Sequence, residues 1–180
     1  MRNQKGFTLV EILVALAIGG IVMAAAYSMY ISQQKAYQIT EQVSALQQNL
    51  RSAMYFLERD LRMAGYNPTK ASIYFGFTDL TLPSPGLFTF GMDTSENGVL
   101  DTDETFTYSL VGNNLRRTSG GVSQTIADNI SDISLTWFNR DGGTPANPSE
   151  ARRVQVTLTA SDGDHTRSLT AMIRCRNMSL

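Results

Sequence analysis

Cysteine and histidine each occur only once in this chain of 180 residues. The lone Cys175 cannot form an intramolecular disulfide, and its simplest role is that of a small apolar residue on a final strand. The lone His165 follows the turn-like tract Asp162-Gly163-Asp164. A nucleophile elbow, a phosphate-binding loop and a metalloprotease motif are also missing. These absences argue against an enzyme. The remaining enzymatic alternative is acid–base chemistry by a carboxylate pair such as Asp101 and Glu104.

Charge is missing from Ile12 to Ile31, a run long enough to cross a bilayer as a helix. A single carboxylate, Glu11, stands directly before this run. An ionisable group in such a segment costs about 2.5–3.5 kcal/mol on insertion scales, so it normally has a partner and a function. We therefore expect Glu11 to have such a partner.

The basic residues Arg2 and Lys5 precede the apolar run. Positive charge at that end keeps the N-terminus in the cytoplasm and sends the rest of the chain across the membrane. A cleaved signal peptide ending at Ala15-Leu16-Ala17 or Ala24-Ala25-Ala26 is the alternative. The length of the run and its continuation into a helical pattern favour a retained anchor.

Net charge argues against a nucleic-acid partner. The chain has 15 basic and 16 acidic side chains, and removal of residues 1–6 would take away Arg2 and Lys5. The remaining 13 basic and 16 acidic side chains give −3. A surface that follows nucleic-acid phosphates needs net positive charge, so no nucleic acid is expected.

An apolar stripe continues beyond the membrane run with gaps of three or four residues, which keeps it on one face of a helix. Its members are Ile39, Val43, Leu46, Leu50, Met54, Leu57 and Leu61. Gly65 and Pro68 then supply a stop signal, and no proline occurs between Phe7 and Tyr66. The pattern predicts one helix from about Phe7 to Ala64, roughly 85–90 Å long.

The remainder of the chain has short β-prone runs separated by Gly, Asn, Asp and Pro. The expected strands are Phe106–Leu110, Leu115–Thr118, Val122–Ile126, Ile133–Phe138, Val154–Ala160 and Ser168–Arg174. The tract Ser161-Asp162-Gly163-Asp164 predicts a hairpin turn between the last two. The fold class is therefore α+β, with an antiparallel sheet packed on the C-terminal half of the long helix.

The tract Lys5-Gly6-Phe7-Thr8-Leu9-Val10-Glu11, between a basic leader and an apolar helix, resembles the class III signal of type IV pilins and pseudopilins. The resemblance implies a pilin fold and cleavage by prepilin peptidase between Gly6 and Phe7. It also implies N-methylation of Phe7, and contact of Glu11 with the N-terminal amine of a neighbouring subunit. Such an ion pair suits a lone carboxylate in lipid, because leaving it unpaired is strongly unfavourable.

Later segments are similar to PilW-like minor pilins and, near the helix end, to GspJ-type minor pseudopilins of type II secretion. They are Met54–Tyr66, Asn97–Asp101, Gly112–Arg117 and Ile126–Ile133. Many major pilins have a proline in the membrane half of the helix and a C-terminal disulfide. This chain has neither, which favours a minor subunit.

The resemblance divides the chain into four parts: a leader (1–6), a membrane-spanning assembly half of the helix (7–31), an amphipathic half (32–65) and a β-rich domain (66–180). It implies a non-enzymatic minor pilin. The chain would be inserted in the bacterial inner membrane as a single-pass protein with a periplasmic domain, and would then enter the pilus to prime or support its assembly. Its partners would be other pilins and prepilin peptidase. A GspJ-like pseudopilin is the near alternative, and a membrane-anchored periplasmic enzyme or calcium sensor is the distant one.

Residues 93–104 match the spacing of a twelve-residue EF-hand loop. The oxygen ligands would come from Asp93, Ser95, Asn97, the carbonyl of Val99, Asp101 and Glu104, with Gly98 at the sharp turn. Strand-like runs, rather than helices, flank the segment. One interpretation of the segment is a calcium loop, and the alternative is a polar turn that hydrogen-bonds its own backbone.

Overall fold

The computed structural model describes residues 6–78 and 88–178. Arg2, Lys5 and the rest of the predicted leader before Gly6 lie outside these ranges. The chain forms two compact units, Met1–Gln42 and Val43–Leu180. The predicted boundaries after residues 31 and 65 stay predictions.

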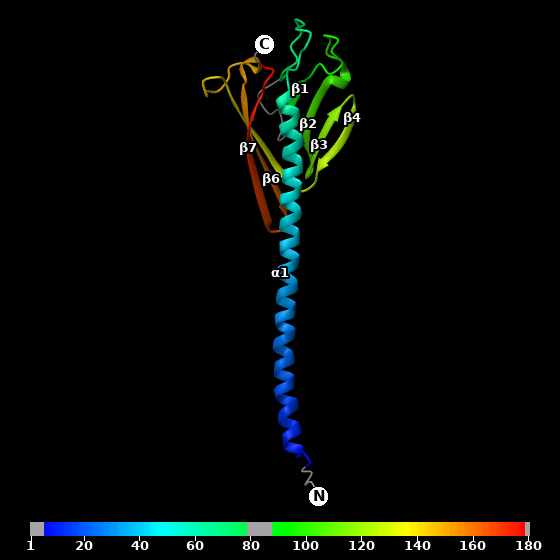
Figure 1. The fold of residues 1–180 in the computed structure, drawn as a ribbon, viewed down its shortest axis with the longest axis vertical. Coiled ribbons are helices and arrows are strands. Elements are labelled where there is room, and N and C mark those ends of the chain that lie inside the picture. The colour runs from blue at the N-terminus through cyan, green and yellow to red at the C-terminus, as the bar shows by residue number, and fades with distance from the viewer. Residues whose placement is uncertain (1–5, 79–87, 179–180) are drawn as a thin grey trace. The chain divides into compact units, whose positions relative to one another are not determined.

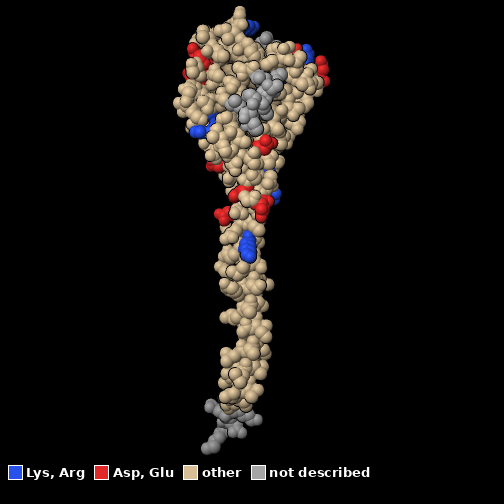
Figure 2. Space-filling view, turned by 180° about the vertical axis from the view of Figure 1, so that it is seen from behind, with Lys and Arg blue, Asp and Glu red and all other residues tan. Residues whose placement is uncertain are grey.

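One helix, α1 (Leu9–Met63), begins in the first unit and ends in the second (Figure 1). Among the described residues, α1 is the one helix long and apolar enough to cross a membrane. In the first unit its large apolar side chains are exposed on all faces, as a lipid-facing segment requires. Figure 2 shows this segment as a surface with few charged side chains.

In the second unit, α1 has one buried face. The predicted stripe is buried from Leu46 through Leu50, Met54 and Leu57 to Leu61, whereas Ile39 remains 46% exposed. Gly65 ends the helix at a φ of +80°, a left-handed conformation that suits glycine. A Cβ at this position would also come within 2.9 Å of the Met178 sulfur, so both space and backbone favour glycine.

Within the described residues, seven strands form two antiparallel sheets (Figure 1). The first sheet has the order β1-β2-β3-β4, and the second has the order β5-β6-β7. The strands are β1 (Phe88–Gly91), β2 (Thr105–Val111), β3 (Asn114–Ser119), β4 (Val122–Ala127), β5 (Ile130–Phe138), β6 (Arg153–Asp162) and β7 (His165–Arg174). The α+β class and all six predicted strands are confirmed, while the division into two sheets was not predicted.

The core of the second unit lies between α1 and both sheets. Val154, Val156, Leu158 and Ala160 are buried on one face of β6, which confirms the predicted alternation. A cluster of aromatic side chains lies on the other sheet. Phe88 stacks on Tyr108 with ring centroids 5.2 Å apart, and Phe90 stacks on Phe106 with ring centroids 5.8 Å apart. Sheet and helix therefore bury their apolar faces against one another in one hydrophobic core.

Candidate processing and assembly site

The Gly6–Phe7 junction precedes the first turn of α1 and is open to solvent. Phe7 is 85% exposed, and a Cβ added to Gly6 would meet no atom within 4 Å. A peptidase needs an extended and accessible backbone at the bond that it cleaves. The structure shows the predicted junction exposed and just outside the helix.

Glu11 forms a capping box with Thr8 at the start of α1. The Thr8 backbone N–H and hydroxyl donate to Glu11 Oε2 at 2.9 and 3.0 Å, and the Glu11 N–H donates to the Thr8 hydroxyl at 3.3 Å. This arrangement satisfies backbone donors that have no partner within the helix. Thr8 was absent from the predicted site, although the spacing Thr-x-x-Glu is its sequence signature.

The capping box leaves half of the Glu11 carboxylate available. Its hydrogen bonds with described residues all involve Oε2, so Oε1 can accept from a group outside the chain. The neighbouring side chains Leu9, Val10 and Ile12 are apolar and exposed. A carboxylate in apolar surroundings interacts strongly with any donor or cation that reaches it, because little water competes there.

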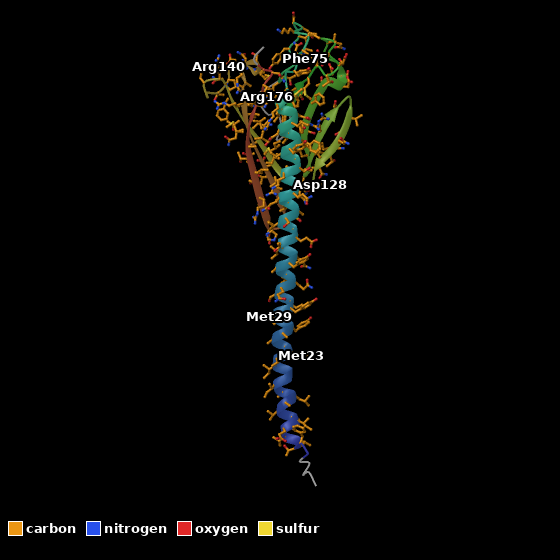
Figure 3. All side chains as sticks on the ribbon, viewed as in Figure 1. Met23, Met29, Phe75, Asp128, Arg140 and Arg176 are labelled. Carbon is orange, nitrogen blue, oxygen red and sulfur yellow. The ribbon has the colours of Figure 1, made fainter. Side chains whose placement is uncertain are left out.

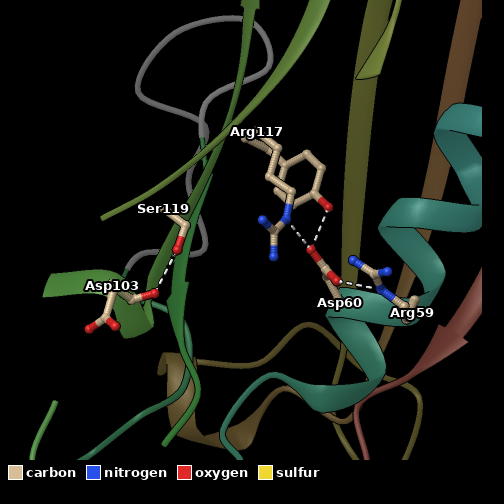
Figure 4. A network of polar contacts seen from close by, with 6 residues as sticks. Arg59, Asp60, Asp103, Arg117 and Ser119 are labelled. Atoms are coloured by element: carbon tan, nitrogen blue, oxygen red, sulfur yellow. Dashed lines mark hydrogen bonds and ion pairs between the residues drawn. The ribbon is translucent and has the colours of Figure 1, made fainter. Parts of the chain in front are cut away.

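A second polar centre fixes α1 to the first sheet (Figure 4). Asp60 is only 3% exposed, and its Oδ2 accepts hydrogen bonds from the Tyr108 hydroxyl at 2.7 Å and from Arg117 Nε at 2.6 Å. Arg59 Nε donates to Oδ1 at 3.0 Å. The buried carboxylate thus has two cationic partners and one neutral donor, as burial of a charge requires.

The partners of Asp60 are themselves held in place. The Arg117 guanidinium lies 4.5 Å from the centre of the Phe106 ring, in a cation–π contact. Burial, and then the charge of Asp60, raise the pKa of Tyr108 well above its usual value near 10, so this hydroxyl stays protonated and donates. Nothing local in the sequence marks this network, since its members lie 48 and 57 residues apart.

The 93–104 segment folds as a turn whose carboxylates accept its own N–H groups. Asp93 Oδ1 accepts from Asn97 N at 3.1 Å, and Oδ2 accepts from Gly98 N at 3.0 Å. Glu104 Oε1 accepts from Ser95 N at 2.6 Å, and Oε2 from Asp101 N at 3.3 Å. These hydrogen bonds are the ones expected for the alternative interpretation, a polar turn that hydrogen-bonds its own backbone.

The hydrogen bonds leave little capacity for a cation. A carboxylate has about four acceptor positions. The Thr69 hydroxyl at 3.5 Å brings Asp93 to three donors, and the Thr94 hydroxyl at 3.2 Å does the same for Glu104. Within residues 6–78 and 88–178, no three His, Cys, Asp or Glu side chains are grouped as a metal site. Calcium therefore stays a prediction, restricted to weak binding.

Glu104 is nonetheless held as a carboxylate. Burial acts to raise its pKa, but the N–H groups of Ser95 and Asp101 and the Thr94 hydroxyl outweigh burial and lower it below its usual value near 4.5. The side chain is 1% exposed and fixes both ends of the turn. The ionised form of Glu104 therefore helps to hold the turn together.

Cys175 is buried and lies just after β7, as predicted for a small core residue. Burial raises the pKa of its thiol to about 12, and the Arg152 charge opposes this only in part. A nucleophilic cysteine needs a lowered pKa. His165 begins β7 at the predicted hairpin and is paired in the ladder with Asp162.

Two protein-family models match the chain. A prokaryotic N-terminal methylation motif covers residues 1–27, and Prepilin peptidase-dependent protein B covers residues 39–175. This chain belongs to the family of Prepilin peptidase-dependent protein B. It is a type IV pilin-like protein, and pilin-like proteins are in general structural rather than enzymatic. Both matches imply processing by prepilin peptidase, which agrees with the exposed Gly6–Phe7 junction.

Curated relatives show a more distant similarity. The chain is 40% identical over 62 residues to "Pilin-like protein PilA3" of Thermus thermophilus, covering 34% of this chain and 27% of that protein. It is 35% identical over 85 residues to two proteins named "Fimbrial protein" of Pseudomonas aeruginosa, covering 46% of this chain and 54% of each relative. The matches therefore span about a quarter to a half of the relatives' lengths.

Proposed function

We propose that this chain is a minor pilin of a type IV pilus, of the PilW type, that primes or supports assembly of the fibre. The observation that supports this most is Glu11. It lies on an exposed apolar helix, four residues after an open Gly6–Phe7 junction, with one carboxylate oxygen available. After cleavage, the amine of Phe7 from one subunit would meet Glu11 of the next and set the register between their helices.

The minor role is supported by two features of the chain. No proline interrupts α1, and the single Cys175 is buried, so the domain has no disulfide of its own. The resemblance described above associates both a proline in this helix and a C-terminal disulfide with many major pilins. The segments 54–66 and 97–101 resemble PilW-like proteins and support that subtype.

We propose that the apolar half of α1 spans the bacterial inner membrane once, with the domain on the periplasmic side, before the subunit moves into the pilus. The first unit supports this, because its apolar side chains are exposed on every face. Other pilins, contacted through α1, would be the partners.

Deletion of this chain in its host tests the proposal. The assay compares surface pili with secreted protein in the same cultures, and re-expression of the intact chain is the control. Loss of pili with secretion intact is the expected result. Normal pili with a secretion defect would instead assign the chain to a GspJ-like pseudopilus.

A further inference from the structure

Five of the chain's arginines surround one hollow at the end of the second sheet. The hollow has a volume of about 820 Å³ and is lined by Arg140, Arg152, Arg153, Arg174 and Arg176 together with two acidic residues. The arginines come from three places: the end of β5, the start of β6 and the end of β7. In register, Arg153 lies opposite Arg174, so adjacent strands place like charges side by side. Such an arrangement is unfavourable unless an anion is bound.

The acidic residues of the hollow form no ion pair within 4.0 Å with these arginines, although the Ala146 N–H and, to a smaller extent, the charge of Arg152 lower the pKa of Glu150. In the part of the chain that the structure describes, the ion pairs within 4.0 Å are Arg59–Asp60, Arg62–Glu58 and Arg117–Asp60. The Glu150 carboxylate accepts instead from Ala146 N at 2.9 Å. Arg152 Nη1 donates to the carbonyls of Ser149 at 2.6 Å and Ala151 at 3.0 Å. The exposed arginines of the hollow are Arg140, Arg174 and Arg176. Guanidinium groups bind carboxylates in a planar, bidentate way, so the hollow is suited to carboxylate side chains from outside.

The chain itself carries a complementary segment. Residues 93–104 include five acidic side chains and no Lys or Arg. Asp93 and Glu104 are buried in the turn, whereas Glu96 and Asp103 are exposed and Asp101 is half-buried. This acidic turn projects between β1 and β2 of the first sheet, and the arginine hollow belongs to the second sheet.

Both features lie where α1 ends. The Tyr66 hydroxyl donates to Glu96 at 3.3 Å, and Asp93 N donates to the Tyr66 carbonyl. On the other side, Asn177, next to Arg176, lies within 3.5 Å of the carbonyls of Arg62 and Met63. Figure 3 shows Arg140 on the side of β6 and β7, away from the first sheet. Two copies standing parallel therefore present turn and hollow at the same level.

We propose that the acidic turn of one copy of this chain docks into the arginine hollow of a second copy beside it. The contact is heterologous, since it joins two different patches, and it leaves one patch open on each end copy. A phosphate polymer fits less well, because no aromatic side chain lines the hollow for base stacking and the chain's net charge is −1. This inference holds whether the chain serves a pilus or a secretion system.

Co-purification of two differently tagged full-length copies in detergent tests the contact. The hollow variant is R140E/R174E and the turn variant is E96R/D103R; all four side chains are exposed. Each variant should associate with itself about tenfold or more weakly than wild type, because like charges then face each other. Hollow and turn variants expressed together should recover association, since each supplies one unaltered patch to the other.

The matched control is D132R/R167E, which changes exposed charges at the opposite end of β5 and β7. It should associate as wild type does, and no variant should melt at a lower temperature than wild type. Unchanged self-association of the hollow and turn variants, or no recovery in the mixture, would overturn the proposal. Wild-type binding of a DNA duplex that is lost in R140E/R174E, with co-purification unchanged, would assign the hollow to phosphate and also overturn it.

Discussion

At the scale of single residues, Glu11 combines two roles that a substitution can separate. It caps α1 through Thr8, and it offers a free oxygen to another subunit. Thr8→Ala should weaken the start of the helix by about 1 kcal/mol. Glu11→Ala should remove the cap and the intersubunit contact together. We expect both variants to be cleaved, and only Glu11→Ala to lose incorporation into fibres, measured by immunoblots of sheared pili.

Two results of the Thr8→Ala and Glu11→Ala experiment would contradict this expectation. Equal loss of incorporation in Thr8→Ala and Glu11→Ala would mean that capping explains the effect. Unchanged assembly in Glu11→Ala would remove its proposed role.

Gly6 is the other residue whose chemistry can be tested directly. No neighbouring atom prevents a methyl group at this position, so Gly6→Ala should leave the fold intact. We expect it to block cleavage, because the peptidase must accommodate the residue before the scissile bond. Mass spectrometry of the membrane fraction would show the uncleaved chain. A trimmed product that begins at Phe7 would contradict the leader assignment.

At the scale of elements, Asp60 links α1 to the first sheet. Asp60→Ala should lower the free energy of unfolding by about 3 kcal/mol, since it leaves Arg117 and the Tyr108 hydroxyl without their acceptor. Glu58→Ala, on the same helix, removes only a partly exposed pair with Arg62 and should lower it by about 0.5 kcal/mol. Chemical denaturation of both variants measures the difference. Equal losses of unfolding free energy in the two variants would show that the buried network stabilises the domain no more than the exposed pair does.

The turn between β1 and β2 should make the domain sensitive to acid. Because the folded-state pKa of Glu104 is lowered, its contribution to stability is present above about pH 4.5 and is lost as pH falls through the folded value. The denaturant midpoint of wild type should therefore fall between about pH 5 and pH 3. Glu104→Gln should lose less over that range, whereas the exposed Asp103→Asn should behave as wild type. An equal loss in all three would contradict this role of Glu104.

Calcium is the remaining question for the same turn. Asp93 and Glu104 are buried, and no described cation lies within ion-pair distance of either. Because each already accepts three hydrogen bonds, we propose no more than weak calcium binding at this turn. We expect millimolar calcium to raise the melting temperature by about 2–4 °C, as about 1 kcal/mol of linked binding would do. Magnesium is the comparison ion. No shift in the melting temperature, or an equal shift in Asp93→Ala/Glu104→Ala, would contradict calcium binding at this turn.

At the scale of the whole molecule, the features that could be predicted from the sequence are those set by local residue patterns. The spacing from Leu46 to Leu61 predicted the buried helix face, and the alternation from Val154 to Ala160 predicted a half-buried strand. Both follow from periods of 3.6 and 2 residues along the chain. Gly65 predicted the helix end because only a local left-handed residue was needed there.

Other features depend on which distant segments meet, and no local pattern reveals that. The division into two sheets is set by pairing between strands, and Asp60 gains its partners from strands about 50 residues later. The arginine hollow likewise collects residues from three strand ends. Thr8 differs, since its capping signature was present in the sequence beside the more conspicuous signal motif.

The end of β7 and the segment after it have a consequence for the order of events during folding. Ile173, Cys175 and Met178 complete the core that Leu46 begins, so its first and last contributors are separated by nearly the whole domain. Contacts this distant in sequence form late, because the loop between them must close first. The interior of the domain can therefore close only after the segment from Ile173 to Met178 has joined it, so this segment is among the last parts of the domain to become native.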